Sequence, residues 1–414
     1  MIRYGIIGGG FISYFHLRAL RQVRGIEVSA LYSRTPPHEL ASKVREMGLG
    51  DPVVCSSIQE LVSSCDVAVI FGPNYARLEH VEQIVEAVQS GSVLKGVICE
   101  KPLARTMQEA RKMMDYISTV KLPTAYFENQ IHMNSVQSQR AQLDPVMRRM
   151  GPPVLTRSSE EHAGPHRPWF WDPIRQGGGV MSDMGCHCLA VGWYALTPPD
   201  KPVDFLRPQS ISADLALLKW GQKEWCARLL NEQGVDYQKT PAEDFATGMV
   251  TYRNPESGQI VKSQFTVSWM YEKQGLRLAL DGMGPGYAFE MNSLKAPSEV
   301  FLTDSAVEGV LNTESALEKT TASRGLLVIQ PNEPDILGYT DENQDAVNAF
   351  SQGRSPMLNW EYGLEIVRLN LAAYLSHEQG KVIDLTDESV QSTLETYIPL
   401  IQQGRGREVL DLTD

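Results

Sequence analysis

The first residues of the chain, Met1-Ile2-Arg3-Tyr4-Gly5-Ile6-Ile7-Gly8-Gly9-Gly10-Phe11-Ile12-Ser13, decide the fold of its N-terminal part. The apolar run predicts a buried strand over 2–7, and the glycines after it predict a tight turn into a helix. Small residues at such a turn let the backbone approach a pyrophosphate, which amides at the helix N-terminus can bind. We therefore predict a dinucleotide site; the alternative is a tight turn without a ligand. The candidate residues are Gly8, Gly10, Phe11 and Ile12.

The next part of the chain alternates between strand-like and helix-like patterns. Helical spacing runs from Leu78 to Val88, and Thr106-x-x-Glu109 fits a capping box at the start of another helix. Near-continuous apolar strands between helices indicate a parallel sheet, because parallel strands need crossover connections. We predict a doubly wound α/β domain of the Rossmann type over 1–128. Its further strands are expected at Glu27–Ser33, Val67–Phe71, Gly96–Glu100 and Thr124–Phe127.

The pattern changes after residue 128. One helix is expected at 179–197, and the segment from about 210 to 335 reads as β structure. Apolar and polar residues alternate through Gln259–Trp269, which is typical of a half-buried antiparallel strand. We predict an α+β domain over 129–414 with a large, mostly antiparallel open sheet. A late helix through Leu364, Val367, Leu371 and Leu375 and a strand at Lys381–Leu385 would follow.

Composition narrows the class of protein. The chain has 414 residues and a net charge of −12, which suits two domains and opposes a nucleic-acid or anionic-membrane partner. No apolar run approaches the roughly 18–20 residues that span a bilayer. A strand that starts at residue 2 leaves no room for a signal peptide. Six scattered cysteines do not form a disulfide framework, so we expect a cytoplasmic protein with reduced thiols.

The end of the second predicted strand concerns the choice of cofactor. An NAD-binding domain usually offers a carboxylate to the adenosine ribose there, whereas this chain has Tyr32-Ser33-Arg34-Thr35. The hydroxyl of Ser33 and the guanidinium of Arg34 suit a 2′-phosphate, which Arg binds with paired, charge-assisted hydrogen bonds. We favour NADP over NAD. Alternatively, Arg34 stacks on the adenine or lies in solvent.

The tripeptide Glu100-Lys101-Pro102 ends another predicted strand. Side chains at the carboxyl ends of parallel strands project into the ligand crevice, so Lys101 is expected to face the cofactor. Pro102 restricts the residue before it to an extended conformation and so fixes its direction. The alternative is an ordinary loop that begins with a Lys-Pro pair.

A glycine run, Gly177-Gly178-Gly179, precedes Asp183 and His187. Three glycines permit close approach of the backbone to a ligand, and residues four apart share one helix face. A carboxylate beside an imidazole suits a proton shuttle. Alternatively, Asp183 interacts with the helix dipole and His187 is structural. We predict no metal site at Cys186-His187-Cys188, because adjacent helical side chains diverge and no second pair has zinc spacing.

The segment from His162 to Pro173 is rich in aromatic rings and polar groups. Such a loop suits a polyhydroxylated ligand, whose C–H faces stack on rings while its hydroxyls take hydrogen bonds. Alternatively, it is an aromatic cluster packed under a domain interface. The candidate substrate-binding residues are His162, His166, Trp169 and Trp171. His162, His166 and Asp172 could bind a metal, but we predict none.

Together these motifs resemble the Gfo/Idh/MocA oxidoreductase family over essentially the whole chain. The resemblance rests on the early glycine turn, on Gly72-Pro73-Asn74, on Glu100-Lys101-Pro102, and on the glycine run followed by Asp183-x-x-x-His187. It implies hydride transfer between a carbinol carbon of a sugar or cyclitol and nicotinamide. It also implies homodimers or homotetramers formed through the C-terminal sheet.

The resemblance further assigns roles to individual residues. His187 would be the acid/base, Lys101 would stabilise the negative charge that develops on the same oxygen, and Asp183 would orient His187 and the substrate; alternatively, the proton passes through Lys101. Three departures from the family pattern are Ser13 in place of the third glycine, the missing ribose carboxylate, and Phe170 where many members have Arg after Trp. The resemblance also places Pro73, Asn74, Glu100 and Lys101 in the cofactor site. It places Asp183 and His187 at the substrate.

Two other functions remain open. One is glycoside cleavage with a tightly held NAD and a transient oxidation, for which His162, His166 and Glu160 or Glu161 would supply the extra acid. The other is a non-catalytic nucleotide-binding sensor, against which the presence of Lys101, Asp183 and His187 argues.

Overall fold

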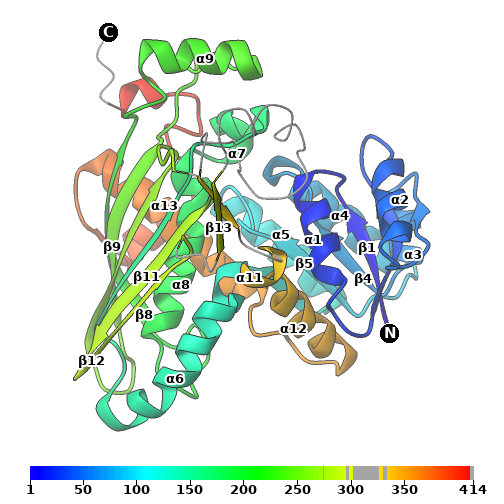
Figure 1. Ribbon diagram of the computed structural model, residues 1–414, viewed down its shortest axis with the longest axis horizontal. Helices are drawn as coiled ribbons and strands as arrows, with labels where there is room; N and C mark the ends of the chain where they lie inside the picture. Colours follow the sequence, from blue (N-terminus) through cyan, green and yellow to red (C-terminus); the bar gives the residue numbers. More distant parts are fainter. Residues whose placement is uncertain (274, 295–297, 302–325, 330–332, 411–414) are drawn as a thin grey trace. The chain divides into compact units, whose positions relative to one another are not determined.

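The computed structural model describes residues 1–273, 275–294, 298–301, 326–329 and 333–410 (Figure 1). It forms two compact units. The N-terminal unit comprises Met1–Asn134, Pro334–Arg368 and Glu395–Tyr397, and the C-terminal unit comprises the rest. We predicted one boundary at 128. The chain first passes from one unit to the other after Asn134, which is close to that position. The N-terminal unit also includes Pro334–Arg368, which we predicted to lie in the second domain.

The N-terminal unit contains a six-stranded sheet in which every pair of neighbours is parallel. The strand order is β3-β2-β1-β4-β5-β6, so the chain starts in the middle and winds in both directions. This confirms the doubly wound sheet, because the strands are connected by helices. The strands are β1 (Ile2–Ile7), β2 (Ile26–Tyr32), β3 (Val53–Val54), β4 (Val67–Ile70), β5 (Gly96–Glu100) and β6 (Thr124–Phe127).

Two helices of this unit begin at residues whose side chains cap them. The side chain of Thr106 accepts a hydrogen bond from the Glu109 amide, and Ser57 does the same for Glu60, as the capping-box pattern predicts. The helices are α1 (Phe11–Leu20), α2 (His38–Glu46), α3 (Ile58–Ser63), α4 (Arg77–Gln89), α5 (Met107–Val120) and α12 (Tyr339–Ser351), with short η1 (Asn74–Ala76) and η2 (Asn129–His132).

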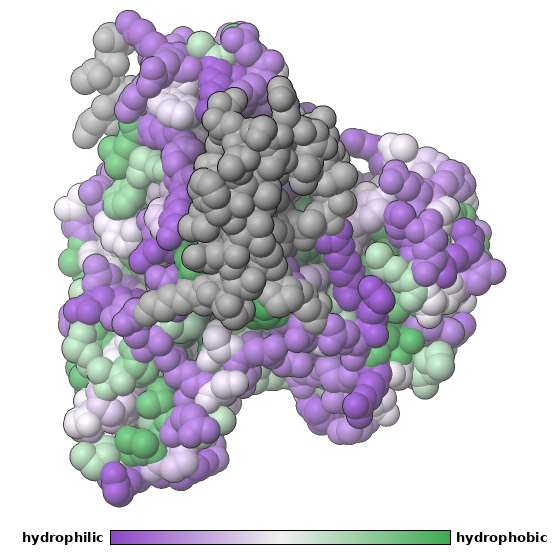
Figure 2. Space-filling view, in the orientation of Figure 1, coloured by the Kyte–Doolittle hydropathy of each residue, from purple (hydrophilic) through white to green (hydrophobic). Residues whose placement is uncertain are grey.

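Helix α12 explains why the later segment joins the N-terminal unit. It packs against α1, and its residues Ala346, Val347 and Phe350 belong to the core of the parallel sheet. A Cβ on Gly96 of β5 would lie 2.6 Å from the Phe350 ring, so the small residue there makes room for α12. Figure 2 shows mostly hydrophilic residues over the outer side of α12. The helix is thus amphipathic, with its apolar side in a core formed mainly by the first 134 residues.

The C-terminal unit contains a seven-stranded sheet with the order β12-β11-β7-β10-β9-β8-β15. Its neighbours are antiparallel except β7 and β10, which confirms the mostly antiparallel sheet. The strands are β7 (Leu155–Glu161), β8 (Arg207–Ala216), β9 (Phe245–Arg253), β10 (Ile260–Ser268), β11 (Arg277–Gly284), β12 (Tyr287–Asn292) and β15 (Ile383–Asp384). A separate pair is formed by β13 (Ser298–Phe301) and β14 (Leu326–Ile329).

Helix α8 (Cys186–Leu196) lies against β7 and β10, and all of its residues are buried. The alternation predicted for the β10 region is confirmed, since Val261, Phe265 and Val267 are buried. The remaining helices are α6 (Asn134–Met150), η3 (Pro168–Trp171), α7 (Pro173–Gln176), η4 (Met181–Gly185), α9 (Lys223–Gln233), α11 (Glu333–Ile336), α13 (Trp360–Gln379), α14 (Glu388–Thr396) and η5 (Gly406–Glu408).

Two predictions for this unit need correction. The region predicted as β from 210 is interrupted by α9, which buries only Cys226 and Leu229 and therefore carries a weak amphipathic pattern. The single helix predicted over 179–197 begins instead as the π-helical turn η4 and becomes α-helical at Cys186. Much of the predicted β region after residue 301 lies outside the described residues. Within the described ranges, the apolar length needed to cross a membrane is found in none of the helices.

Candidate dinucleotide and catalytic site

The glycine turn after β1 has the conformation that a dinucleotide needs. Gly8 has φ +129°, and a Cβ there would lie 2.9 Å from the Phe71 carbonyl carbon, so a side chain would be strained and would clash. Gly10 begins α1 without a side-chain cap, and among the described residues nothing lies within 4 Å of where its Cβ would be. The space beside this helix N-terminus and its backbone amides fit a phosphate group.

Two serines surround this turn. Ser13, which replaces the third glycine of the motif, is buried and donates from Oγ to the Gly8 carbonyl at 2.9 Å. It therefore stabilises the turn and does not occupy the open space at Gly10. A Cβ on Gly9 would lie 3.5 Å from Ser33 Oγ, which places the end of β2 beside the turn. The next residue, Arg34, is exposed.

The other predicted cofactor residues follow β4 and β5. Pro73 precedes η1, and Asn74 is buried in it. The order β1-β4-β5 makes these strands neighbours in a parallel sheet, so their carboxyl ends lie along one edge. Lys101 comes directly after β5, and the Lys101–Pro102 peptide bond is cis.

Arg77, which the sequence did not single out, holds the backbone around Lys101. This buried side chain donates to the carbonyls of Glu100 at 2.5 Å, of Lys101 at 3.1 Å and of Pro102. Its Nε also donates to the Gly72 carbonyl at 3.2 Å. One guanidinium therefore connects the loops after β4 and β5, and its charge is neutralised in part by carbonyl dipoles.

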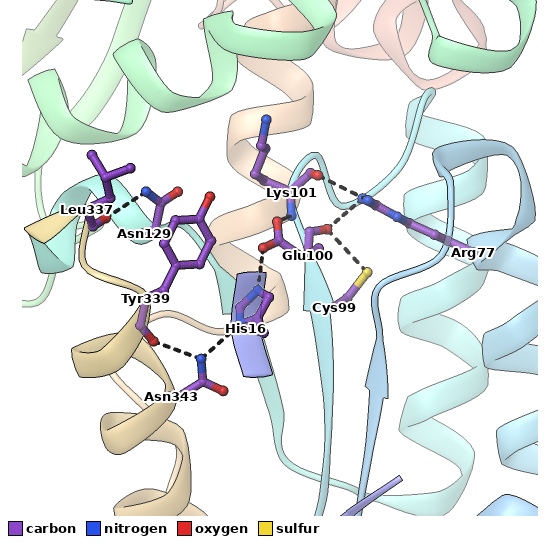
Figure 3. A network of polar contacts seen from close by, with 9 residues as sticks. All are labelled: His16, Arg77, Cys99, Glu100, Lys101, Asn129, Leu337, Tyr339 and Asn343. Atoms are coloured by element: carbon purple, nitrogen blue, oxygen red, sulfur yellow. Dashed lines mark hydrogen bonds and ion pairs between the residues drawn. The ribbon is translucent and has the colours of Figure 1, made fainter. Parts of the chain in front are cut away.

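Glu100 is connected to Lys101 and to α1, as Figure 3 shows. One oxygen, Oε2, accepts from the Lys101 amide at 2.9 Å, and Oε1 lies 2.9 Å from His16 Nε2. Burial by itself raises the pKa of this carboxyl, but the His16 hydrogen bond and the charges of Lys101 and Arg77 outweigh it and lower the pKa. Glu100 is therefore an ionised carboxylate whose two oxygens have protein partners.

The glycine run of the C-terminal unit has a different role from the expected one. A Cβ on Gly178 would lie 2.0 Å from the Tyr374 hydroxyl, and a Cβ on Gly179 would lie 2.2 Å from the Glu243 carbonyl oxygen. The expectation was close approach of a ligand. In the structure, the small residues make room for side-chain and backbone atoms of the protein itself.

Glu243 is a second residue that sequence reasoning missed. Its Oε1 accepts from the amides of Gly179 and Met181, each at 3.0 Å, and from the Tyr374 hydroxyl at 2.6 Å. Burial raises the pKa of this carboxyl to about 7, although these hydrogen bonds oppose the shift. A lone acidic residue far along the chain gave no signal of this role. Glu243 fixes the start of the segment that carries Asp183 and His187.

The π-helical turn changes the relation between the two predicted catalytic residues of this unit. Asp183 is buried in η4, and His187 is buried in the first turn of α8, so the simple four-residue spacing of an α-helix does not apply between them. His187 Nε2 lies 3.9 Å from Oε2 of Glu160, a buried residue of β7. A carboxylate from a neighbouring strand therefore faces the imidazole.

The aromatic segment divides into a buried and an outer part. Trp171 is 1% exposed, and its ring centroid lies 4.8–5.3 Å from those of Trp220, Tyr237 and Trp269. Its indole N–H donates to the Pro165 carbonyl at 3.1 Å. For Trp171 the structure thus favours the packing alternative over contact with substrate.

The other candidate residues of this segment differ from Trp171. His162 is buried, and its Nδ1 accepts from the Gly164 amide at 2.9 Å. His166 is exposed, and Trp169 is partly exposed with its ring 3.9 Å from that of Phe170. His166 and Trp169 therefore remain the candidates that a dissolved ligand can reach. All six cysteines are buried and none forms a disulfide.

Both halves of the chain match known domains. Residues 2–124 match an oxidoreductase family with an NAD-binding Rossmann fold, and residues 148–283 match the GFO/IDH/MocA C-terminal domain. A 1,5-anhydro-D-fructose reductase of Ensifer adhaerens is 30% identical over 190 residues, which are 45% of this chain and 54% of that protein. An inositol 2-dehydrogenase of Agrobacterium fabrum is 30% identical over 115 residues, which are 28% and 32% of the two chains. The chain thus spans about half or less of the length of these relatives.

Solved structures share the fold over nearly the whole chain. GenD2 from gentamicin A biosynthesis, solved in complex with NAD, has a TM-score of 0.70 at 17% identity and covers 93% of this chain and 97% of its own. The myo-inositol 2-dehydrogenase of Lactobacillus plantarum has a TM-score of 0.64 at 17% identity and covers 92% and 99%. With both domains matched in order, the chain belongs to the Gfo/Idh/MocA family of oxidoreductases.

Proposed function

We propose that this protein is an NAD(P)-dependent oxidoreductase that transfers a hydride between a carbinol carbon of a sugar or cyclitol and nicotinamide. Family membership supports the reaction class, and relatives named for anhydrofructose and inositol support the substrate class. The observation that carries the proposal is the arrangement of one parallel sheet: the glycine turn follows β1 and Lys101 follows β5, at the same edge. A cationic amine there can reach a group bound beside the nucleotide.

The cofactor would be held mainly by backbone groups. The turn at Gly8 to Ile12 would bind the pyrophosphate, and Pro73 and Asn74 would contact the nucleotide beyond it. When bound, nicotinamide accepts or supplies the hydride. The protein must then bind the alcohol, orient its carbon and move one proton.

Lys101 and His187 have different roles at the alcohol oxygen. The ammonium group of Lys101 stabilises negative charge on this oxygen as the hydride leaves, and its backbone is fixed by Arg77 and Glu100. His187 takes the hydroxyl proton as general base and returns it in the reverse direction. Asp183 orients the substrate and His187. The carboxylate of Glu160 favours the protonated imidazole that forms after proton uptake.

We propose further that the protein prefers NADP over NAD. The exposed guanidinium of Arg34 follows β2, beside the glycine turn, where the ribose of the adenosine binds in this fold. A 2′-phosphate there gains charge-assisted hydrogen bonds from Arg34 and Ser33. The assembly we propose is a homodimer or homotetramer formed through the open sheet of the C-terminal unit.

A second candidate function has one observation in its favour. Glu160 beside His187 supplies an additional carboxyl group, which a glycoside-cleaving reaction with transient oxidation would need as an acid. Net formation of reduced nicotinamide separates the two functions, because the redox-neutral cleavage produces none.

The test is a panel of sugars, cyclitols and glycosides offered with NAD and with NADP, in both directions. The proposal predicts stoichiometric formation of reduced nicotinamide with at least one polyol. Release of an aglycone without net reduction would support glycoside cleavage. No turnover with any member, together with normal nucleotide binding, would favour a sensor.

A further inference from the structure

Three side chains and the Lys101 backbone amide form a continuous hydrogen-bonded chain inside the N-terminal unit, from α12 to Lys101 (Figure 3). Asn343 Nδ2 lies 2.9 Å from His16 Nδ1, and His16 Nε2 lies 2.9 Å from Glu100 Oε1. Glu100 Oε2 accepts from the Lys101 amide at 2.9 Å. His16, Glu100 and Asn343 are all buried. A residue 242 positions after Lys101 is thereby connected to its backbone.

The directions of the two hydrogen bonds made by His16 follow from one carbonyl. Asn343 Nδ2 also lies 2.8 Å from the carbonyl oxygen of Tyr339, which can only accept, so the NH₂ of Asn343 faces this position. The same NH₂ donates to His16 Nδ1, which must therefore be the unprotonated nitrogen. The single imidazole proton is on Nε2 and is donated to Glu100. Glu100 then presents a carboxylate oxygen to the Lys101 amide.

The surroundings agree with this assignment. The His16 ring stacks on Phe71 at 4.0 Å, and burial lowers the pKa of His16 despite the adjacent carboxylate. Glu342 of α12 is also buried, and burial together with the charges of Glu100 and Glu128 raises its pKa. Burial therefore favours the uncharged form of Glu342. Lys101 and Arg77 are the cations that act on Glu100 in addition to its hydrogen-bond partner His16, which would add to their effect when protonated.

A metal site in the same place is a weaker explanation. His16, Glu100 and Glu342 each have a ligand atom within 4.8 Å of the others. However, both His16 nitrogens and both Glu100 oxygens already have protein partners, and a metal would have to displace them. The hydrogen bonds account for these groups without an ion.

We propose that His16 and Asn343 are positioning residues for Lys101: Asn343 fixes the His16 tautomer, His16 holds the Glu100 carboxylate, and Glu100 fixes the Lys101 backbone. The inference rests on the proposed role of Lys101 in hydride transfer. Neither residue is expected to touch substrate or nucleotide. A small displacement of Lys101 is enough to slow the reaction, because the ammonium must meet the alcohol oxygen at hydrogen-bond distance.

Paired variants separate positioning from packing. His16→Phe keeps a stacked ring and removes the donor, whereas His16→Gln places an amide N–H near the position of Nε2. We expect His16→Phe to lower kcat roughly 10- to 100-fold with an unchanged Kd for nucleotide, and His16→Gln to restore most of the loss. Restoration of kcat by His16→Gln distinguishes loss of the donor from loss of packing, because both variants change the ring or its shape but only His16→Phe lacks an N–H.

Helix α12 offers a matched control for Asn343. Gln344 is its neighbour and joins α12 to the backbone of Arg24, at 2.8 Å and 3.3 Å, without reaching Glu100. Asn343→Leu should lower kcat several-fold, while Gln344→Leu should leave kcat unchanged. If His16→Phe does not fold in a thermal-unfolding assay, the Asn343→Leu and Gln344→Leu pair decides.

A second readout does not depend on activity. NMR spectra of the imidazole nitrogens, with the His16 signal identified by its loss in His16→Gln, should show the Nε2–H tautomer at neutral pH. A protonated or Nδ1–H imidazole would overturn the inference, as would an unchanged kcat in His16→Phe or equal losses in His16→Phe and His16→Gln. A wild-type protein that turns over no substrate but shows the Nε2–H tautomer would instead count against the proposed function.

Discussion

The two segments that carry the candidate catalytic groups are both held by a buried carboxyl group that accepts from backbone amides. The pKa values of these two carboxyl groups are shifted in opposite directions. Glu100 accepts from the Lys101 amide, and Glu243 accepts from the amides of Gly179 and Met181. Glu100 has a histidine donor and two nearby cations, which lower its pKa. Glu243 has a tyrosine donor and a buried environment, which raises its pKa to about 7. Burial raises the pKa of both acids, and only at Glu100 do the neighbouring donor and cations outweigh it.

The difference has a consequence for stability against pH. A carboxyl with a lowered folded-state pKa stabilises the fold above its unfolded pKa and loses this contribution only in acid. A carboxyl with a raised pKa keeps its proton in the fold after the unfolded chain has lost it, so its contribution falls as pH rises between the two values. The Glu100 carboxylate should thus contribute no pH dependence near neutrality, whereas the Glu243 carboxyl should contribute one there.

Glu100→Gln tests how much the Glu100 carboxylate stabilises the N-terminal unit. An amide cannot accept from both His16 and the Lys101 backbone without turning its own NH₂ toward one of these donors, and the free energy of unfolding should fall by about 2 kcal/mol. Denaturant unfolding of the purified variant measures this loss. A variant as stable as wild type would show that the two hydrogen bonds to Glu100 contribute nothing.

Glu243→Gln should have an effect that depends on pH. From about pH 5 to about pH 7 the wild type should lose about 2 kcal/mol of stability through this one carboxyl, and Gln removes that dependence. Thermal unfolding of both proteins at about pH 5 and about pH 8 tests the sign. The variant should gain relative to wild type at the higher pH; a relative loss there would mean that folding does not raise the pKa of Glu243.

Arg34→Ala concerns the nucleotide end of the same N-terminal unit and should leave stability unchanged. Binding of NADP should weaken roughly 10-fold or more, because charge-assisted hydrogen bonds to the 2′-phosphate are lost, while NAD binding should hardly change. Fluorescence titration with both nucleotides measures it. Lys43→Ala, which removes an exposed positive charge from α2, is the control. Equal losses for NAD and NADP would defeat the NADP preference.

Most of the N-terminal fold could be predicted because its signals are local. The glycine turn, the apolar strands and the capping residue Thr106 each determine structure within a few positions. The return of α12 to this unit could not be predicted, since an amphipathic helix does not specify which core its apolar side joins. The candidate residues Lys101, Asp183 and His187 came from motifs.

The residues that hold the candidate catalytic groups in place are brought to them by tertiary contacts. Arg77, His16, Asn343 and Glu243 lie far in sequence from the groups they hold, and no spacing connects them. The glycine run indicated that other atoms approach the backbone closely there. Sequence alone could not show that these atoms belong to Tyr374 and Glu243. The π-helical turn before His187 likewise had no local signal that we could identify.

The most direct test of the central claim is single-turnover hydride transfer in wild type and in Lys101→Met, at saturating nucleotide and with the best polyol of the panel. We predict reduced nicotinamide in the wild type and a rate roughly 10²- to 10³-fold lower in the variant, with an unchanged Kd for nucleotide. An equal rate in Lys101→Met would contradict the assignment of the catalytic amine. Polyol conversion in the wild type without any reduced nicotinamide would contradict the proposed reaction.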